Sequence, residues 1–135
     1  MYGPRQDPHG EAGVVAIFMG LLAGEGTPKI FGDGRQTRDY VFVGDVVDAT
    51  LAALDHPGGV LNVGTGVEVS VLELYDAISR VSGIERDPEH AAARLGELQR
   101  SVLDPRRAER ELGWRPRHSL DDGLRATWEW MSAPS

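Results

Sequence analysis

The sequence predicts a layered α/β protein that forms one domain or part of one. Short segments with strand character alternate with longer segments of helical periodicity, the usual pattern of layered α/β folds. With 135 residues and 41% hydrophobic content, the chain can bury one modest core. The strand candidates are too few to close a doubly wound sheet, so we expect the chain to be part of a larger architecture.

The first half of the chain contains two predicted helices and two extended segments. Apolar residues recur at helical spacing over residues 11–22, and two glycines end that helix. Residues 29–31 are a short strand candidate before a Gly-Asp-Gly turn, whose glycines permit positive φ. Residues 36–43 form a second extended segment, and residues 45–54 form an amphipathic helix that a Pro-Gly-Gly sequence closes.

The second half is predicted to contain a short buried strand at residues 60–63 and three helices. Ser70 and Glu73 match a capping box, and the helix that they begin ends at a glycine, residue 83. After a polar stretch without periodicity, residues 99–103 are extended and Asp104-Pro105 begins a short helix. Residues Ser119 to Asp122 match a capping-box variant at the start of the final helix. One face of that helix is expected to pack on the body through Leu124, Thr127, Trp128 and Met131.

Composition and charge exclude several classes of function. The chain has 14 basic and 21 acidic residues and a net charge of -7, which argues against a general nucleic-acid or anionic-membrane surface, so any anion must be bound locally. It has no Cys, which excludes disulfides and thiolate metal sites, and its four His lack metal-ligand spacing. No apolar run is long enough to span a bilayer and no signal peptide is recognisable, so we expect a cytoplasmic protein.

Five short motifs, in order and in register, resemble the C-terminal third of extended short-chain dehydrogenases/reductases, the NAD-dependent epimerase/dehydratase family. They lie between Tyr2 and about Trp130, and they are most similar to the UDP-glucose 4-epimerase subgroup. The motifs are Tyr2-Gly3-Pro4-Arg5, Phe31-Gly32-Asp33-Gly34-x-Gln36-Thr37-Arg38-Asp39-Tyr40, Asn62-Val63-Gly64-Thr65-Gly66, Arg94-x-Gly96-Glu97 and Leu112-Gly113-Trp114-x-Pro116.

This resemblance implies a Rossmann NAD domain followed by a smaller lobe that holds the nucleotide diphosphate of a nucleotide sugar. Residues 1–135 would be the C-terminal substrate-binding portion, a small mixed α/β lobe with a partial Rossmann-type layer to which about residues 40–65 contribute. The N-terminal NAD-binding domain would lie outside this sequence. The implied partners are a UDP-sugar, a separate or missing Rossmann domain and, as a further candidate, a second copy of the chain.

The resemblance also implies the charged residues of a binding site. Arg38 and Arg94 would hold the diphosphate, because a planar guanidinium offers paired donors to phosphate oxygens. Glu97 would accept hydrogen bonds from the ribose hydroxyls, since both members of a diol can donate to one carboxylate. The alternatives are a structural ion pair of Arg38 with Asp39 or another carboxylate, and an exposed charged loop at residues 94–97.

Four further residues have both a binding and a structural interpretation. Ile30 and Phe31 lie where the family packs the uracil ring, although a buried strand also favours an aliphatic and an aromatic residue. Gln36 would contact the ribose or a phosphate, or else be a solvated turn residue. Val14 lies where family members give backbone contacts near the phosphates, and its side chain is also a core candidate.

The residues of the family's redox chemistry are not recognisable in this sequence. That chemistry uses a Tyr with a Lys four residues later, and none of the three tyrosines here has that partner. Gly10-x-x-Gly13-x-x-Ala16 resembles a dinucleotide-binding turn, but the residues before it, 7–9, do not have strand character. Met1 stands where the family usually has Val after a substrate-binding Asn. We therefore assign no catalytic, cofactor-binding or metal residue and expect the chain alone to be inactive.

Several functions remain open at this stage. The first is the UDP-sugar-binding portion of an NAD-dependent epimerase of the UDP-glucose 4-epimerase type, in which hydride moves between the hexose C4 and NAD. The alternatives are a stand-alone module that binds a nucleotide-diphosphate sugar, an inactive fragment, and the same lobe from a 4,6-dehydratase or decarboxylase. These classes share the motifs, so the residues do not identify the sugar or the reaction.

Overall fold

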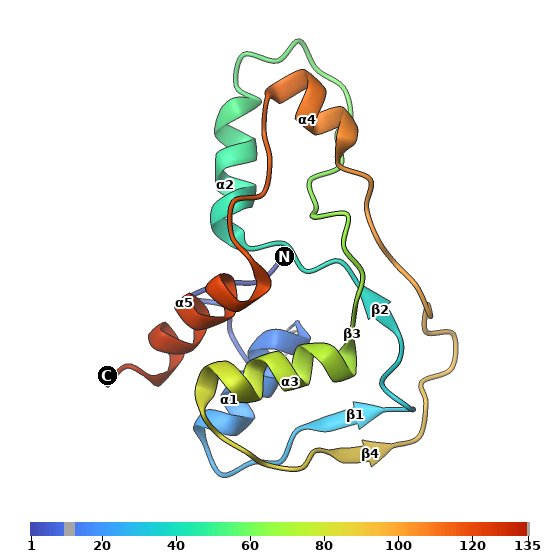
Figure 1. Cartoon of the computed structure of the whole chain (residues 1–135), viewed down its shortest axis with the longest axis vertical. Coiled ribbons are helices and arrows are strands. Elements are labelled where there is room, and N and C mark those ends of the chain that lie inside the picture. Colours follow the sequence, from blue (N-terminus) through green and yellow to red (C-terminus); the bar gives the residue numbers. More distant parts are fainter. Residues whose placement is uncertain (10–12, 135) are drawn as a thin grey trace.

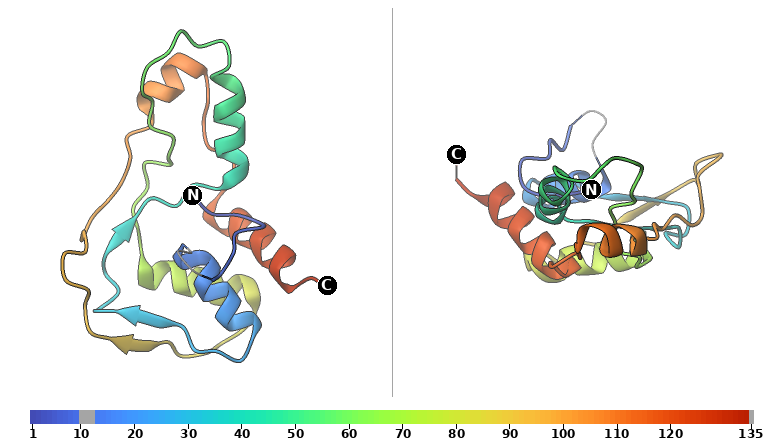
Figure 2. Two further views of the ribbon diagram at one scale, coloured as in Figure 1. Left: turned by 180° about the vertical axis from the view of Figure 1, so that it is seen from behind. Right: turned by 90° about the horizontal axis from the view of Figure 1, so that it is seen from above.

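The computed structural model describes residues 1–9 and 13–134 and shows an elongated molecule with helices at both ends (Figure 1). We call α1, α3 and α5, with β1 and β4 beside them, the three-helix region, and α2 with α4 the α2–α4 region (Figure 2). In chain order the elements are α1 (Val14–Ala23), β1 (Lys29–Phe31), β2 (Thr37–Arg38), α2 (Val43–Ala52), β3 (Val69–Ser70), α3 (Val71–Ser82), β4 (Glu89–Ala91), α4 (Arg106–Leu112) and α5 (Leu120–Ser132).

The three-helix region contains the main hydrophobic core. Leu74 and Ile78 of α3 are fully buried, as is Leu124 of α5. Phe18 of α1 meets Tyr75 of α3 edge to face, with ring centroids 5.4 Å apart. Each helix therefore buries one face against the other two, and α5 does so through the face that the sequence predicts. The members of this core are Tyr2, Val15, Phe18, Met19, Leu22, Ile30, Val71, Leu74, Tyr75, Ala77, Ile78 and Leu124.

The predicted helix caps of α3 and α5 are confirmed. The Ser70 hydroxyl accepts from the Glu73 amide at 3.1 Å, and the Glu73 carboxylate accepts from the Ser70 amide at 2.8 Å, which makes a complete capping box. Gly83 ends α3 in the left-handed conformation at φ 70°. The Ser119 hydroxyl caps α5 by accepting from the Asp122 amide at 3.1 Å.

Four short strands form two pairs within the described part of the chain. β1 pairs with β4 in parallel, with Ile30 opposite His90, and β2 pairs with β3 antiparallel, with Arg38 opposite Val69. β1 agrees with the sequence prediction, but β4 lies in the stretch that we expected to be irregular. Because two of its three residues are exposed, β4 has no apolar alternation that the sequence could show.

The α2–α4 region has a small core and a buried polar anchor. Ala49 of α2, Ala108 of α4 and Trp114 form the core. The buried Asp45 carboxylate accepts from the backbone amides of Arg117 and His118 at 3.0 and 3.2 Å and contacts the His118 ring at 2.9 Å. The Asp45 carbonyl accepts from Trp114 Nε1 at 2.9 Å. Burial opposes ionisation of Asp45, but these hydrogen bonds outweigh it and hold its pKa below the usual value.

Several predicted boundaries were wrong. α2 begins at Val43 rather than residue 45, and within the predicted extended segment 36–43 Thr37–Arg38 forms a strand and Phe42 an isolated bridge to Tyr2. Residues 60–63, expected to be a buried strand, form none in the described chain, and Val60 is 83% exposed. α4 begins at Arg106, with Pro105 as its N-cap rather than its first residue. The first helix begins at Val14, and the start predicted at residue 11 lies outside the described residues.

The apolar residues of α2 also differ from expectation. The sequence places Val47, Leu51 and Leu54 on the buried face of an amphipathic helix, but they are 51%, 60% and 75% exposed. The buried face of α2 is instead the one that carries Asp45 and Ala49. Apolar periodicity shows that one face of a helix is hydrophobic. It does not show whether the residues that cover this face belong to the same chain.

Candidate functional site

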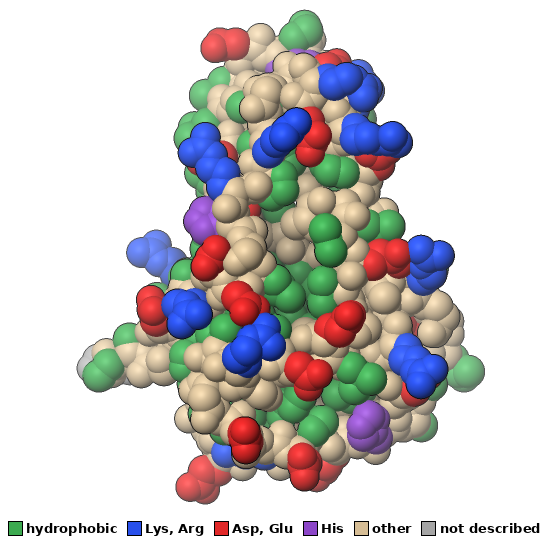
Figure 3. All heavy atoms as spheres, in the orientation of Figure 1, with side chains coloured by type: hydrophobic (Ala, Val, Ile, Leu, Met, Phe, Trp, Pro, Cys, Tyr) green, Lys and Arg blue, Asp and Glu red, His purple; other side chains and the backbone are tan. Residues whose placement is uncertain are grey.

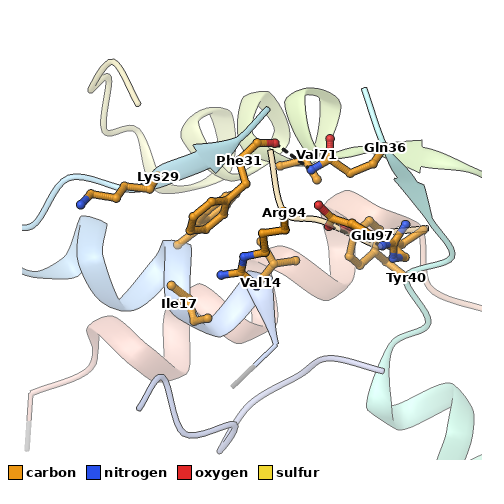
Figure 4. A pocket seen from close by; sticks show the side chains of 11 residues that line it. Val14, Ile17, Lys29, Phe31, Gln36, Tyr40, Val71, Arg94 and Glu97 are labelled. Carbon is orange, nitrogen blue, oxygen red and sulfur yellow. Dashed lines mark hydrogen bonds and ion pairs between the residues drawn. The ribbon is translucent and has the colours of Figure 1, made fainter. Parts of the chain in front are cut away.

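A cavity of about 210 Å³ lies between the start of α1, the end of β1, β2 and the loop after β4 (Figure 4). The side chains that point into it come from segments more than 60 residues apart in the sequence. Six of the seven predicted site residues line this cavity, and Ile30 does not. The lining residues are Val14, Ile17, Phe18, Lys29, Phe31, Gln36, Arg38, Tyr40, Val71, Arg94 and Glu97.

Arg38 is held by backbone carbonyls and by Glu97. Its Nη1 donates to the carbonyls of Thr37 and Leu98, each at 2.7 Å, and its Nη2 lies 3.5 Å from Glu97 Oε1. The alternative of an ion pair is therefore met by Glu97 and not by Asp39. Two anchored hydrogen bonds fix the direction of the guanidinium, and the contact with Glu97 is its weaker interaction.

The Asp39 carboxylate has a separate, structural position. Its two oxygens accept from the amides of Thr65 and Gly66 and from the Thr65 hydroxyl, which lies at 2.6 Å. A further amide, that of Leu103, lies at 3.3 Å. Asp39 therefore ties the end of β2 to two loops, and it is not available to neutralise Arg38.

Arg94 covers the ring of Phe31. Its guanidinium carbon lies 3.9 Å from the ring centroid, which is a cation–π contact between the loop after β4 and the end of β1. The expectation of an exposed charged loop is met in part, because Arg94 is exposed, but its head group lies against the cavity wall (Figure 4). Phe31 and Arg94 together form one side of the site.

Gln36 and Ile30 are both buried, with different consequences for the site. Gln36 is 6% exposed and its Nε2 donates to the Phe31 carbonyl at 3.0 Å, so the interpretation as a solvated turn residue was wrong. Ile30 is fully buried in the main core, which confirms its packing role, and its side chain does not reach the cavity. Val14 is half-buried and packs on the core, which confirms the structural role of its side chain, and it also lines the cavity.

Tyr40 also lines the cavity, although the sequence analysis assigns it no binding role. Its hydroxyl is buried and has no hydrogen-bond partner among the described residues. Burial raises the pKa of Tyr40 to about 12, with Arg38 opposing and Glu97 reinforcing the shift, so the phenol keeps its proton. Its position two residues after Arg38 was the available signal, because alternate residues of an extended segment share a face.

The cavity is cationic although the protein is acidic. Lys29, Arg38 and Arg94 line it with a single carboxylate, Glu97, in a chain of net charge -7. On the face drawn in Figure 3, by contrast, acidic and basic side chains are interspersed. The N-terminus of α1 adds partial positive charge, because Gly13 provides no side-chain cap for the first-turn amides. The charges that line this cavity therefore favour an anion, although the net charge of the chain is negative.

Sequence comparison shows the class of protein to which this site belongs. Residues 1–127 match the profile of the family described as GDP-mannose 4,6 dehydratase. The chain belongs to this family, which confirms the resemblance to epimerases and dehydratases that act on nucleotide sugars.

Individual relatives of known function are similar over nearly the whole chain. The UDP-glucose 4-epimerase of Mycolicibacterium smegmatis is 55% identical over 133 residues, which cover 97% of this chain and 42% of that protein. The crystal structure of UDP-glucose 4-epimerase from Thermotoga maritima with UDP-glucose aligns with a TM-score of 0.92 and 44% identity, over 96% of this chain and 42% of that one. The Thermus thermophilus UDP-glucose 4-epimerase complex with NAD gives a TM-score of 0.85 at 42% identity, over 96% of this chain and 43% of that one.

The chain corresponds to only part of each of these relatives. It spans about 42% of the length of the curated relative from Mycolicibacterium smegmatis. The matched part contains the cavity described above.

None of the helices in the described part of the chain is both long and apolar enough to cross a membrane.

Proposed function

We propose that this chain is the UDP-sugar-binding portion of an NAD-dependent sugar-nucleotide epimerase of the UDP-glucose 4-epimerase type. The observation that carries the proposal is the convergence of Arg38, Arg94 and Phe31 on one cationic cavity in an acidic protein. The similarity to an epimerase solved with UDP-glucose supports the same ligand class.

The cavity suits each part of a nucleoside diphosphate. Phe31 would pack against the uracil ring, with the backbone of β1 beside it. Arg38 and Arg94 would hold the diphosphate, with the amides at the start of α1, which Gly13 does not cap, as further donors. Glu97 would accept from the ribose hydroxyls, with Gln36 nearby. The ligand would thus lie across the mouth of the cavity, from β1 towards α1.

Ligand binding would replace two weak contacts with stronger ones. A half-exposed ion pair such as Arg38 with Glu97 contributes about 0–1 kcal/mol, and an exposed cation–π contact such as Arg94 on Phe31 contributes about 0.5–1 kcal/mol. Charge-assisted hydrogen bonds from guanidinium to phosphate are about twice as strong as neutral ones. A diphosphate can therefore replace the contact of Arg38 with Glu97 and that of Arg94 with Phe31, which would free Glu97 and the Phe31 ring for the nucleoside.

In the whole protein, NAD would be bound by a domain that corresponds to the part of the relatives outside the alignment with this chain. Residues 7–9 form no strand ahead of the one glycine-rich candidate, and Gly10 lies outside the described residues, so nothing described here fits a dinucleotide-binding turn. NAD, when bound, would supply reversible oxidation of the sugar. The residues of this chain would bind and orient the nucleotide end of the substrate.

Residues 40–65 would contribute to the Rossmann domain of the whole protein. Val47 and Leu51 of α2, with Leu54 and Val60 after it, support this assignment because they are large apolar side chains that stay exposed in the described chain. The chain without that domain would bind ligand but not turn it over. Dimerisation is a further proposal, and it can be tested by measuring the mass of the chain in solution.

A nucleotide-sugar 4,6-dehydratase lobe is the second candidate, because the matching family profile is described by that reaction. The two candidates differ in the base and sugar that the site selects. Titration with GDP-mannose beside UDP-glucose separates them. Tighter binding of GDP-mannose would favour the dehydratase.

Isothermal calorimetry on the purified chain tests the proposal. UDP, UDP-glucose, UDP-galactose and dTDP-glucose are titrated, together with NAD. We expect UDP compounds to bind and NAD to give no heat. Arg38→Ala and Arg94→Ala should each weaken UDP binding by about 10-fold or more, since a hydrogen bond to a charged group contributes about 1.5–3 kcal/mol.

Arg106→Ala is the matched control. Arg106 pairs with Asp104 at the start of α4 and does not line the cavity, so its loss should leave UDP affinity unchanged. Equal UDP affinity in the wild type and both cavity variants would refute the assignment of the two arginines. A chain that is folded by circular dichroism and binds no nucleotide would overturn the proposed function.

A further inference from the structure

Arg94 and Glu97 of the nucleotide cavity lie on one exposed segment, residues 92–103, which we call the Arg94 loop. All of its residues are described, they form no helix or strand, and the loop runs from β4 towards α4 (Figure 1). Leu95 and Leu98 are 103% and 66% exposed, so apolar packing contributes little to holding the loop in place. Polar contacts at its two ends therefore fix the positions of the charged side chains that it carries.

The first part of the Arg94 loop is a tight turn that presents both charged residues. The Glu97 amide donates to the Arg94 carbonyl at 3.4 Å. Gly96, in the third position of this turn, has φ 76°, a left-handed conformation that glycine adopts without strain. The loop begins at the end of β4, which pairs with β1 and its residue Phe31. One end of the loop is thus fixed beside the aromatic wall of the cavity.

The other end of the Arg94 loop is fixed on β2. The Thr37 amide donates to the Gln99 carbonyl at 2.9 Å, and the Ser101 amide donates to the Thr37 carbonyl at 3.2 Å. The next residue of β2 is Arg38, whose guanidinium donates to another carbonyl of the loop at 2.7 Å. The loop and one of the arginines proposed to hold the diphosphate therefore depend on each other for their positions.

An ion pair between Glu68 and Arg100 joins this end of the loop to the β2–β3 pair. Glu68 directly precedes β3. Arg100 Nε and Nη2 donate to its two carboxylate oxygens at 2.8 and 2.6 Å, and the Thr37 hydroxyl donates to Oε1 at 2.7 Å. A two-point contact of this kind fixes direction as well as distance. The hydrogen bonds from Arg100 and Thr37 lower the pKa of Glu68 to about 2, so the carboxylate is ionised at neutral pH.

The ion pair lies outside the nucleotide cavity, since neither Glu68 nor Arg100 is among the described residues that line it. An effect of the pair on a ligand would therefore be indirect. Most exposed ion pairs contribute little to global stability, but this one joins a loop without apolar packing to the strand that carries Arg38.

We propose that Glu68 and Arg100 are positioning residues, whose ion pair keeps the Arg94 loop against β2 and so holds the charged groups of the cavity in the arrangement that binds a nucleoside diphosphate. Without the pair, the loop spends part of its time away from β2. The apparent dissociation constant then rises in inverse proportion to the fraction of molecules with the loop in place. The inference rests on the proposed function, since it requires the ligand to bind at this cavity.

Glu68→Gln tests the proposal through the sign of its effect on affinity. Removal of a negative charge near a bound diphosphate strengthens binding if Coulomb interaction alone matters. If Glu68 positions the loop, the same substitution should weaken UDP binding by about 3- to 10-fold, which corresponds to a loop in place in about a third to a tenth of the molecules. Calorimetric titration of the full chain with UDP measures the change.

Arg100→Gln and the double variant test whether the two residues act together. Each variant removes the same ion pair, so all three should weaken UDP binding by similar factors, and the two single effects should not multiply. Hydrogen–deuterium exchange of residues 98–103 gives a measurement without ligand, because the Ser101 amide is bonded to Thr37. We expect this segment to exchange faster in all three variants.

Arg80→Gln and Asp121→Asn are the matched controls. Arg80 and Asp121 form another exposed two-point ion pair, with Nη2 and Oδ1 2.7 Å apart, but it joins α3 to α5 and lies outside the nucleotide cavity. These substitutions should leave both the UDP affinity and the exchange of the Arg94 loop unchanged. An equal loss of UDP affinity in the controls would refute a specific positioning role for Glu68 and Arg100.

The outcomes separate this inference from the proposed function. If no UDP compound binds to the folded wild type, the proposed function fails and the positioning role fails with it. If UDP binds and Arg38→Ala weakens that binding, the proposed function holds. The positioning role is then overturned if folded Glu68→Gln binds UDP as tightly as the wild type or more tightly, or if the exchange of the Arg94 loop does not change.

Discussion

The three-helix region and the α2–α4 region are stabilised in different ways. The core of the three-helix region contains twelve buried residues, whereas the core of the α2–α4 region contains three. The second region compensates with the hydrogen bonds of the buried Asp45, and it leaves Leu51 and Leu54 exposed. The three-helix region buries its apolar helix faces within the described chain, whereas the α2–α4 region leaves apolar side chains exposed.

The difference should appear most strongly in core truncations. Leu74 of α3 is fully buried, and Leu51 of α2 is 60% exposed. We expect Leu74→Ala to lower the free energy of unfolding by about 2–5 kcal/mol because it leaves a cavity, and Leu51→Ala to change it by about 0.5 kcal/mol or less. Urea denaturation followed by circular dichroism measures both. A loss at Leu51 equal to that at Leu74 would contradict the comparison.

The polar anchor of the α2–α4 region gives the second effect. Asp45→Asn keeps the size of the side chain but removes one acceptor from the amides of Arg117 and His118, so we expect a loss of about 2 kcal/mol at pH 7. Asp122→Asn, at the exposed cap of α5, is the control, and it should cost less. Equal losses of unfolding free energy in the two variants would mean that burial does not strengthen the contribution of the Asp45 hydrogen bonds to stability.

The same residue predicts a pH dependence. The folded pKa of Asp45 is held below its ordinary 3.8, so its contribution to stability is fully present above that value and is lost as the pH falls through the folded pKa. As the pH is lowered from 5 to 3, the urea concentration at the unfolding midpoint should therefore fall less steeply in Asp45→Asn than in the wild type. Parallel curves would show that other carboxylates dominate acid unfolding.

The smallest effect is expected at the exposed surface of α2. Leu51→Lys should change the stability of the chain by about 0.5 kcal/mol or less, since the side chain has no partner in the described structure. The variant should also reduce any self-association of the chain, because it places a charge among the exposed apolar residues of α2. Sedimentation velocity at several concentrations checks this. A loss above about 1 kcal/mol would indicate that Leu51 is already buried in solution.

The site was predictable to the extent that it depends on short motifs. Arg38, Arg94 and Glu97 were selected because the motifs that contain them resemble those of the family, and they do line one cavity. The sequence did not show that Arg38 pairs with Glu97 or that Arg94 covers Phe31, because these contacts join segments about 60 residues apart. Tyr40 was missed for a related reason, since the lack of a partner for its buried hydroxyl among the described residues is a property of the whole fold.

By itself, the sequence determined the helices with strong local signals, the caps at Ser70 and Ser119, the β1 strand with its glycine turn, and the family. Those features depend on residues within a few positions of one another, where propensity and hydrogen bonding act directly. Only the tertiary structure decided that β4 pairs with β1, that residues 60–63 form no strand and that one face of α2 stays exposed. These features depend on which distant surfaces meet, and a local pattern carries no information about the partner.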